Sequence, residues 1–144
     1  MYKHILIATD GSELAGRAIT AGLELAKPLR AKVTAVTATE PWAGMIGGEA
    51  ALSFPIEDYD KAAAENAARI LSSVSETARQ AGVACETLHI NGFPAEAIVE
   101  AAKARGCDLI VMASHGRRGL SKLFLGSQAS RVLALSAVAV LVCR

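Results

Sequence analysis

The chain has few aromatic residues, few cysteines, no surplus of charge and no long apolar run. Aromatic side chains make up 4% of its 144 residues, whereas hydrophobic residues of all kinds make up 52%. The core must therefore consist of Ala, Val, Ile and Leu. A chain of this length can bury enough of them to fold as a single domain over residues 1–144 without disulfides or structural metals.

The three cysteines exclude two common kinds of framework. Cys85, Cys107 and Cys143 are widely spaced and odd in number, and no CxxC pair occurs. This pattern fits neither a disulfide scaffold nor a zinc site, and the three histidines do not complete a metal pattern. Buried thiols in a reducing compartment are the expectation.

The charge balance and the apolar runs exclude further classes. There are 15 Lys and Arg against 14 Asp and Glu, for a net charge of +1, so a nucleic-acid partner is not expected. The apolar run near the N-terminus ends at Asp10, which is too short for a secretory signal, and no stretch approaches the roughly 18–20 residues of a membrane span. We predict a soluble cytoplasmic protein with no membrane partner.

Short apolar runs alternate with longer Ala-rich stretches that have helical spacing. Strands are predicted at 4–9, 32–38, 83–90, 108–113 and 137–143, and helices at 13–28, 57–81, 93–105 and 127–135. The first, fourth and fifth strands are almost continuously hydrophobic, which is typical of strands buried on both faces of a parallel sheet. The sequence therefore predicts one doubly wound α/β domain with helices on both faces.

In such sheets, ligands bind at the carboxyl ends of the strands, where the strand order reverses. Asp10, Gly11 and Ser12 follow the first strand, and a glycine-containing segment with Gly116 follows the fourth. Gly126 and Ser127 then open the next helix. Glycines let backbone N–H groups approach an anion, and a helix N-terminus favours phosphate, so a nucleotide crevice is indicated.

Simpler interpretations of the same residues stay open. The glycines also suit ordinary turns, and Asp10 also suits a turn or cap carboxylate. As a site residue, Asp10 would accept hydrogen bonds from ribose hydroxyls or help to hold Mg²⁺. The sequence has neither a GxxxxGK[ST] phosphate loop nor a GxGxxG motif after any strand, which disfavours P-loop ATPases and dinucleotide dehydrogenases.

The chain resembles the universal stress protein family along essentially its whole length. The resemblance lies in the opening YKHILIATDGS, the DLIVM strand, the SHGRRG segment and the closing VAVLV. Members that bind ATP carry Gly-x2-Gly-x9-Gly-(Ser/Thr), which falls here on Ala113, Gly116, Gly126 and Ser127. Ala113 departs from the motif by one methyl group, which is tolerated where the backbone φ is negative.

The resemblance implies a strand order of 3-2-1-4-5 and a set of ligand contacts. Thr9 and Asp10 would line the ribose side, the backbone near Ala38 would meet the adenine edge, and Met112 and Ala113 would lie near the ribose. The phosphates would lie near Gly116, Arg117, Gly126, Ser127 and Gln128. It also implies a homodimer through the last strand, from Ala137 to Val142, which would otherwise be an exposed apolar edge.

Two features lack a definite assignment. The segment from Thr39 to Pro55 carries apolar side chains, among them Trp42, and is either a cover for the nucleotide, a partner-binding surface or a region that folds back on the domain. His115 is expected to order its loop or contact ligand rather than to catalyse, because no paired carboxylate is visible.

The function predicted on this basis is a cytoplasmic, homodimeric stress protein that binds ATP, with Mg²⁺, at the crevice between the first and fourth strands. Asp10 is the only obvious carboxylate there, so at most slow ATP hydrolysis is expected. One alternative keeps the fold and the dimer but replaces nucleotide binding with partner docking at Thr39 to Pro55. Another, a nucleotidyl-transfer enzyme, is disfavoured because the sequence has no HxGH-type motif.

Overall fold

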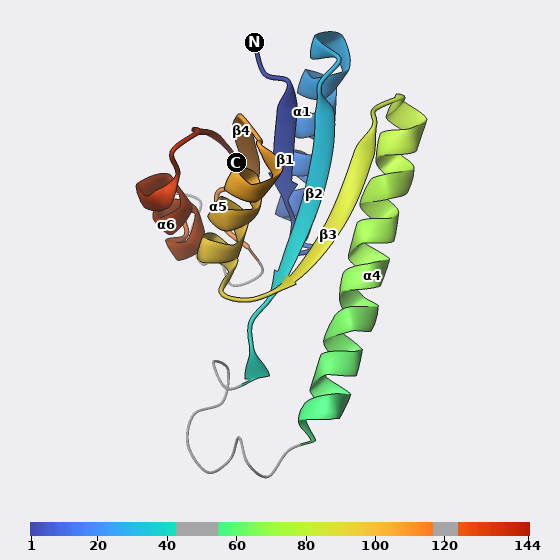
Figure 1. Ribbon diagram of the computed structural model, residues 1–144, viewed down its shortest axis with the longest axis vertical. Coiled ribbons are helices and arrows are strands. Elements are labelled where there is room, and N and C mark those ends of the chain that lie inside the picture. The colour runs from blue at the N-terminus through green and yellow to red at the C-terminus, as the bar shows by residue number, and fades with distance from the viewer. Residues whose placement is uncertain (43–54, 117–123) are drawn as a thin grey trace.

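The computed structural model describes residues 1–42, 55–116 and 124–144, which form a parallel sheet between two layers of helices (Figure 1). The sheet has five strands in the order β3-β2-β1-β4-β5, and every pairing is parallel, which confirms the predicted fold class and strand order. The elements in chain order are β1 (His4–Ala8), α1 (Glu13–Leu29), β2 (Lys32–Thr39), α4 (Ile56–Ala81), β3 (Cys85–Asn91), α5 (Pro94–Arg105), β4 (Leu109–Ala113), α6 (Ser127–Leu135) and β5 (Ala139–Cys143).

Each face of the sheet carries its own core. On one face, Ile5, Ile7 and Val111 pack with residues of α1 and α4, whereas on the other, Leu6 and Ile110 pack with α5 and α6. Successive strand residues point to opposite faces, so these continuous apolar runs serve both cores at once. None of the described helices is both long enough and apolar enough to cross a membrane.

Several element boundaries differ from the predicted ones because local caps use the terminal residues. The third strand begins at Cys85 rather than at residue 83, because Gly82 adopts a left-handed φ of 72° and Val83 N donates to Ala78 O at the end of α4. The fifth strand begins at Ala139, because the Ser136 hydroxyl accepts from Val138 N and donates to Val138 O. Such bonds hold the chain in a turn before pairing starts.

The fifth strand is the exposed apolar edge that its place in the strand order predicts, although its hydrophobic run is also typical of a strand buried on both faces. β5 pairs only with β4 and forms one edge of the sheet, so Ala139 and Leu141 are exposed. Its continuous apolar run therefore reflects a strand that is only half covered within this chain.

The central strand β1 is shorter than its neighbours at the carboxyl end. Its pairing with β2 stops at Ala8↔Val36, whereas β2 continues beside β3 as far as Thr39↔Asn91. Its pairing with β4 stops at Ile7↔Val111, whereas β4 continues beside β5 to Ala113↔Cys143. The sheet therefore has a notch at the end of β1, bordered by Ala38 on one side and by Met112 and Ala113 on the other.

Candidate functional site

A cavity of about 370 Å³ lies at this notch. Its volume is within the roughly 300–1,000 Å³ typical of small-molecule sites. Nine predicted site residues line it: Thr9, Asp10, Ala38, Met112, Ala113, Gly116, Gly126, Ser127 and Gln128. The tenth, Arg117, lies outside the described residues. The structure thus brings together segments that are more than a hundred residues apart in the sequence.

The floor of the cavity is the tight turn after β1. The Thr9 hydroxyl accepts from Gly11 N (3.1 Å), and Asp10 Oδ1 accepts from Ser12 N (2.9 Å). Gly11 has a φ of 79°, which suits glycine, and Ser12 caps α1 by accepting from Ala15 N at 3.2 Å. Both polar side chains of the floor are therefore held in place by the turn itself.

The two motif glycines are needed for different reasons. A Cβ on Gly116 would lie 2.4 Å from Asp10 Oδ2, so glycine at this position lets the backbone of residue 116 lie against the carboxylate. A Cβ on Gly126 would lie 2.7 Å from Ser114 O and 3.0 Å from His115 Cα, and Gly126 N itself donates to Ser114 O. Gly126 is thus required by the packing of its own loop, in addition to any role toward a ligand.

Ala113 fits the strand without backbone strain. It is the last residue of β4, where it pairs with Cys143, and among the described non-glycine residues only Arg30 has a positive φ. The extra methyl group therefore meets the condition of a negative φ, under which it is tolerated.

The N-terminus of α6 faces the cavity without a side-chain cap. Its N-cap residue, Gly126, makes no side-chain cap hydrogen bond, and its first turn holds no acidic residue. In contrast, α1 begins with a serine cap followed by Glu13. Uncapped N–H groups and the positive end of the helix dipole favour an anion, so this side of the cavity suits phosphate.

Gln128 has a second role, which the sequence did not reveal. Its amide oxygen accepts from Ala95 N (3.2 Å), in the first turn of α5, whose own N-cap residue, Phe93, makes no side-chain cap bond. Gln128 therefore ties the starts of α5 and α6 together beside the cavity.

The apolar wall of the cavity was not predicted. It includes Val36 on β2 and Pro94 and Ile98 on α5, and Glu40 lies just beyond the end of β2. The position of α5 in the sequence could have indicated this wall. The helix follows β3 directly, so it starts at the edge of the sheet where the strands end and where the cavity lies. Its Ala-rich pattern alone did not separate a cavity wall from ordinary core.

His115 and the segment after β2 also have defined neighbours. The His115 ring lines the cavity, and its Nδ1 lies 3.1 Å from the Ser114 hydroxyl. The Trp42 ring packs on Tyr59 of α4, with centroids 4.8 Å apart and planes at 52°. Residues 43–54, which hold most of the segment from Thr39 to Pro55, lie outside the described residues.

For a metal ion, the described part of the chain offers no group of three or more His, Cys, Asp or Glu ligands. The carboxylates that line the cavity are Asp10 and Glu40. A single carboxylate such as Asp10 suits Mg²⁺ when phosphate oxygens and water complete the coordination, so the residues present fit a nucleotide-bound ion.

A second hollow, of about 600 Å³, lies between α4 and the edge strand β3. It is lined by small helical side chains such as Ala68 and Ser72, together with Thr87 and His89. Among the described residues, no helix begins there. The notch at β1, which combines an apolar wall, the held carboxylate of Asp10 and a helix N-terminus, is therefore the candidate site.

A doubly wound parallel sheet with a ligand-sized cavity at its switch point defines a class of α/β small-molecule-binding proteins. The model of the universal stress protein family matches residues 1–144, and the chain belongs to this family. Universal stress protein YxiE of Bacillus subtilis is 32% identical over 151 residues, with both chains covered completely.

Solved structures share the fold. The structure of MJ0577 from Methanocaldococcus jannaschii has a TM-score of 0.82 at 27% identity and covers 99% of this chain and 96% of its own. A universal stress protein solved in complex with cAMP has a TM-score of 0.74 at 25% identity and covers 99% of this chain and 97% of its own.

Proposed function

We propose that the cavity at the notch binds an adenine nucleotide, with ATP as the ligand. The observation that carries this proposal is that the cavity has two chemically different sides. Residues of β2 and α5 form an apolar wall, and the uncapped N-terminus of α6 provides a side that favours an anion. A nucleotide has a matching polarity, with an apolar base at one end and phosphates at the other. A universal stress protein solved in complex with cAMP supports an adenine nucleotide as the class of ligand.

The residues divide into three groups on this proposal. The wall around Ala38 holds the base, Thr9 and Asp10 accept hydrogen bonds from the ribose with Met112 and Ala113 beside it, and the phosphates lie near α6. The residues proposed to lie near the phosphates are Gly116, Arg117, Gly126, Ser127 and Gln128. Asp10 would also hold Mg²⁺ together with the phosphates.

The proposed assembly is a homodimer through β5. Leu141 on this edge is 40% exposed, and the neighbouring helix α6 exposes Leu133 (45%) and Leu135 (46%). An apolar edge strand needs cover, and pairing with the same strand of a second copy provides it with two-fold symmetry.

The proposed role is cytoplasmic signalling or protection under stress through nucleotide occupancy, with at most slow ATP hydrolysis. Bound ATP would supply the signal by its presence, because fast hydrolysis would need a positioned water as well as Mg²⁺, and the described lining contributes two acidic residues, Asp10 and Glu40. The alternative, partner docking on the segment from Thr39 to Pro55, applies if the cavity binds no nucleotide.

The test is a calorimetric titration with ATP and Mg²⁺ of the wild type, Ser127→Asp and Ser130→Asp. Ser127 lines the cavity in the first turn of α6, whereas Ser130 lies on the same helix outside the described lining. An aspartate at a helix N-terminus stabilises the helix, so Ser127→Asp should fold while its charge repels phosphate. Gly126 is a poorer choice, because any side chain there would displace the loop.

We expect wild type and Ser130→Asp to bind ATP alike and Ser127→Asp to bind at least tenfold more weakly, about 1.4 kcal/mol. Absence of binding by the wild type at millimolar ATP would overturn the proposal and favour partner docking. Equal loss in both aspartate variants would place the phosphates away from the start of α6.

A further inference from the structure

The wall that β2 contributes to the cavity ends in a carboxylate. Val36, Ala38 and Glu40 alternate along the chain and all line the cavity. Alternate residues of a strand share one face and lie about 7 Å apart. The wall therefore consists of two apolar side chains followed, at its outer end, by Glu40.

The position of Glu40 is fixed from α4. The Tyr59 hydroxyl donates to Glu40 O at 2.7 Å, and the Tyr59 ring packs on Trp42. The pKa of Tyr59 is raised, first by burial and then by the negative charges of Glu40 and Asp60. Glu40 is thus held between β2 and α4 with its charge close to the hydroxyl that holds its backbone.

The carboxylate of Glu40, on the side of the cavity proposed for the base, favours a base with a hydrogen-bond donor at its edge. An ionised carboxylate has only acceptors, so it attracts a donor and repels a carbonyl oxygen. The edge of adenine carries an exocyclic amino group, whereas hypoxanthine carries a carbonyl oxygen at the same position. A base that lies on Val36 and Ala38 would present this edge toward the outer end of the wall.

We propose that Glu40 selects the base: its carboxylate accepts a hydrogen bond from the exocyclic amino group of a purine, and Tyr59 is a positioning residue for Glu40. This inference rests on the proposed nucleotide binding and deepens it, because it names amino-bearing purines as the ligand class. Glu40 does not belong to the glycine motif.

The test compares ATP with ITP, in which a carbonyl oxygen replaces the exocyclic amino group and the neighbouring ring nitrogen N1 carries a proton. Dissociation constants are measured for the wild type, Glu40→Gln and Glu40→Asp, with Glu24→Gln as the matched control. Glu24 is an exposed residue of α1 outside the described lining of the cavity. A charge-assisted hydrogen bond predicts that the wild type binds ATP roughly tenfold or more tightly than ITP.

In Glu40→Gln, the carboxamide can donate to the carbonyl of ITP or accept from the amino group of ATP, so the ratio of the two constants should approach one. In Glu40→Asp, the charge is kept but withdrawn by one methylene group, so ATP binding should weaken while ITP stays the poorer ligand. The control should keep the wild-type ratio.

The role of Tyr59 is tested with Tyr59→Phe, which keeps the ring on Trp42 but removes the hydrogen bond to Glu40. We expect the ratio between ITP and ATP to fall part of the way toward one, whereas simple loosening of the fold would weaken both ligands equally. Trp42 is the only tryptophan, so its emission reports independently whether the contact with the ring persists.

The outcomes separate the two proposals. If the wild type binds neither nucleotide, the proposed function fails and this inference fails with it. If ATP binds but the wild type does not discriminate against ITP, or if Glu40→Gln discriminates as the wild type does, the cavity binds nucleotide and the role of Glu40 is refuted.

Discussion

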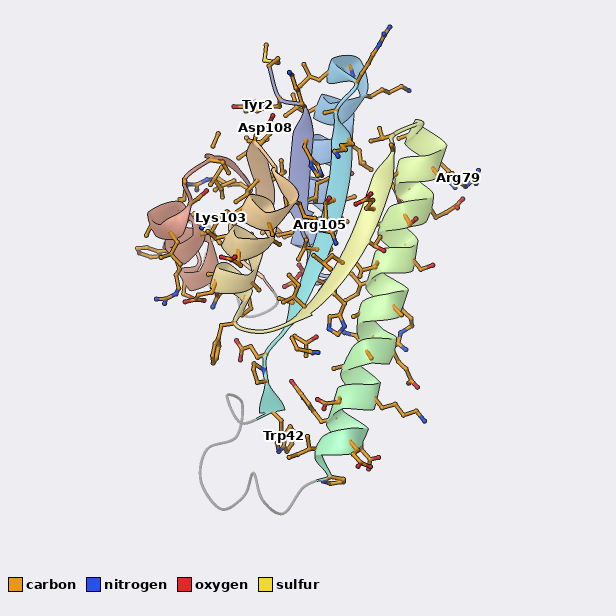
Figure 2. All side chains as sticks on the ribbon, viewed as in Figure 1. Tyr2, Trp42, Arg79, Lys103, Arg105 and Asp108 are labelled. Carbon is orange, nitrogen blue, oxygen red and sulfur yellow. The ribbon has the colours of Figure 1, made fainter. Side chains whose placement is uncertain are left out.

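The strands β1 and β4 lie side by side at the centre of the sheet, and an aspartate lies at each end of this pair. The aspartate at the amino end joins the two strands, whereas the aspartate at the carboxyl end lines the cavity. At the amino end, the Asp108 carboxylate accepts from Lys3 N (2.8 Å) and His4 N (3.1 Å), and Asp108 N donates to His4 O (2.9 Å). At the carboxyl end, Asp10 bonds within its own turn, to Ser12 N. Figure 2 shows Asp108 and Tyr2 at one end of the sheet and Trp42 toward the other.

The difference shows how a site arises from strand length rather than from residue type. Asp108 bridges the starts of β1 and β4, so its carboxylate closes the sheet. Asp10 follows a strand that stops short of both neighbours, so its carboxylate lines a cavity. We therefore expect changes at the amino end to alter stability and changes at the carboxyl end to alter binding.

Asp108→Ala should have the largest effect. Two backbone N–H groups lose a charged acceptor, and we expect the free energy of unfolding to fall by about 2 kcal/mol. Urea denaturation measures this loss. The dissociation constant for ATP, measured where the variant is folded, should stay that of the wild type; a large change in this constant would show that the two ends are not independent.

Asp10→Asn should weaken ATP binding and leave stability almost unchanged, which is the reverse of the effect expected for Asp108→Ala. The asparagine oxygen can still accept from Ser12 N, so we expect the free energy of unfolding to stay within about 0.5 kcal/mol of the wild type. ATP binding should weaken roughly tenfold, because the charged acceptor for the ribose is lost. Asp58→Asn, on the exposed first turn of α4, is the matched control, and equal binding by both variants would remove Asp10 from the site.

The smallest expected effect concerns His4, at the amino end of β1. We expect this residue to make the free energy of unfolding depend on pH. His4 is 6% exposed, and its Nε2 lies 2.8 Å from the Thr34 hydroxyl. Burial, followed by the charge of Lys32, lowers the pKa of His4 below 6.5. The unfolded chain therefore takes up a proton more readily, and the free energy of unfolding should fall as the pH drops below about 6.5.

His4→Gln keeps a polar partner for Thr34 but does not titrate, so its stability should depend less on pH over this interval. Urea denaturation of both proteins between about pH 7.5 and about pH 5 measures the difference. Parallel curves for the two proteins would contradict the assignment to His4.

The sequence predicted the fold because short apolar runs alternate with stretches of helical spacing along the whole chain. Gly82 and Gly106 end α4 and α5 with left-handed φ angles of 72° and 65°, which is consistent with the predicted ends of these helices. The boundaries it missed depend on local hydrogen bonds: the backbone bond from Val83 N to Ala78 O before β3, and the bonds between the Ser136 hydroxyl and Val138 before β5. Nothing in a hydrophobic pattern encodes those bonds.

For the site, the sequence predicted residues that follow strands and missed those that form walls. Asp10, Gly116 and Ser127 stand where a polar or glycine residue interrupts the pattern. Val36 and Ile98 look like ordinary core residues, and their place at the cavity depends on β1 ending early. The dual role of Gln128 depends on how α5 and α6 meet, which no local pattern reveals.

The most direct test of the account is to follow every backbone amide by two-dimensional NMR during a titration with ATP and Mg²⁺. We predict saturable shifts at the carboxyl end, centred on Asp10, Ala38, Met112 and Gly126 to Gln128, with Lys3, His4 and Asp108 unchanged. Shifts centred on the groove between α4 and β3 or on the amino end, or no saturable shift at all, would contradict it.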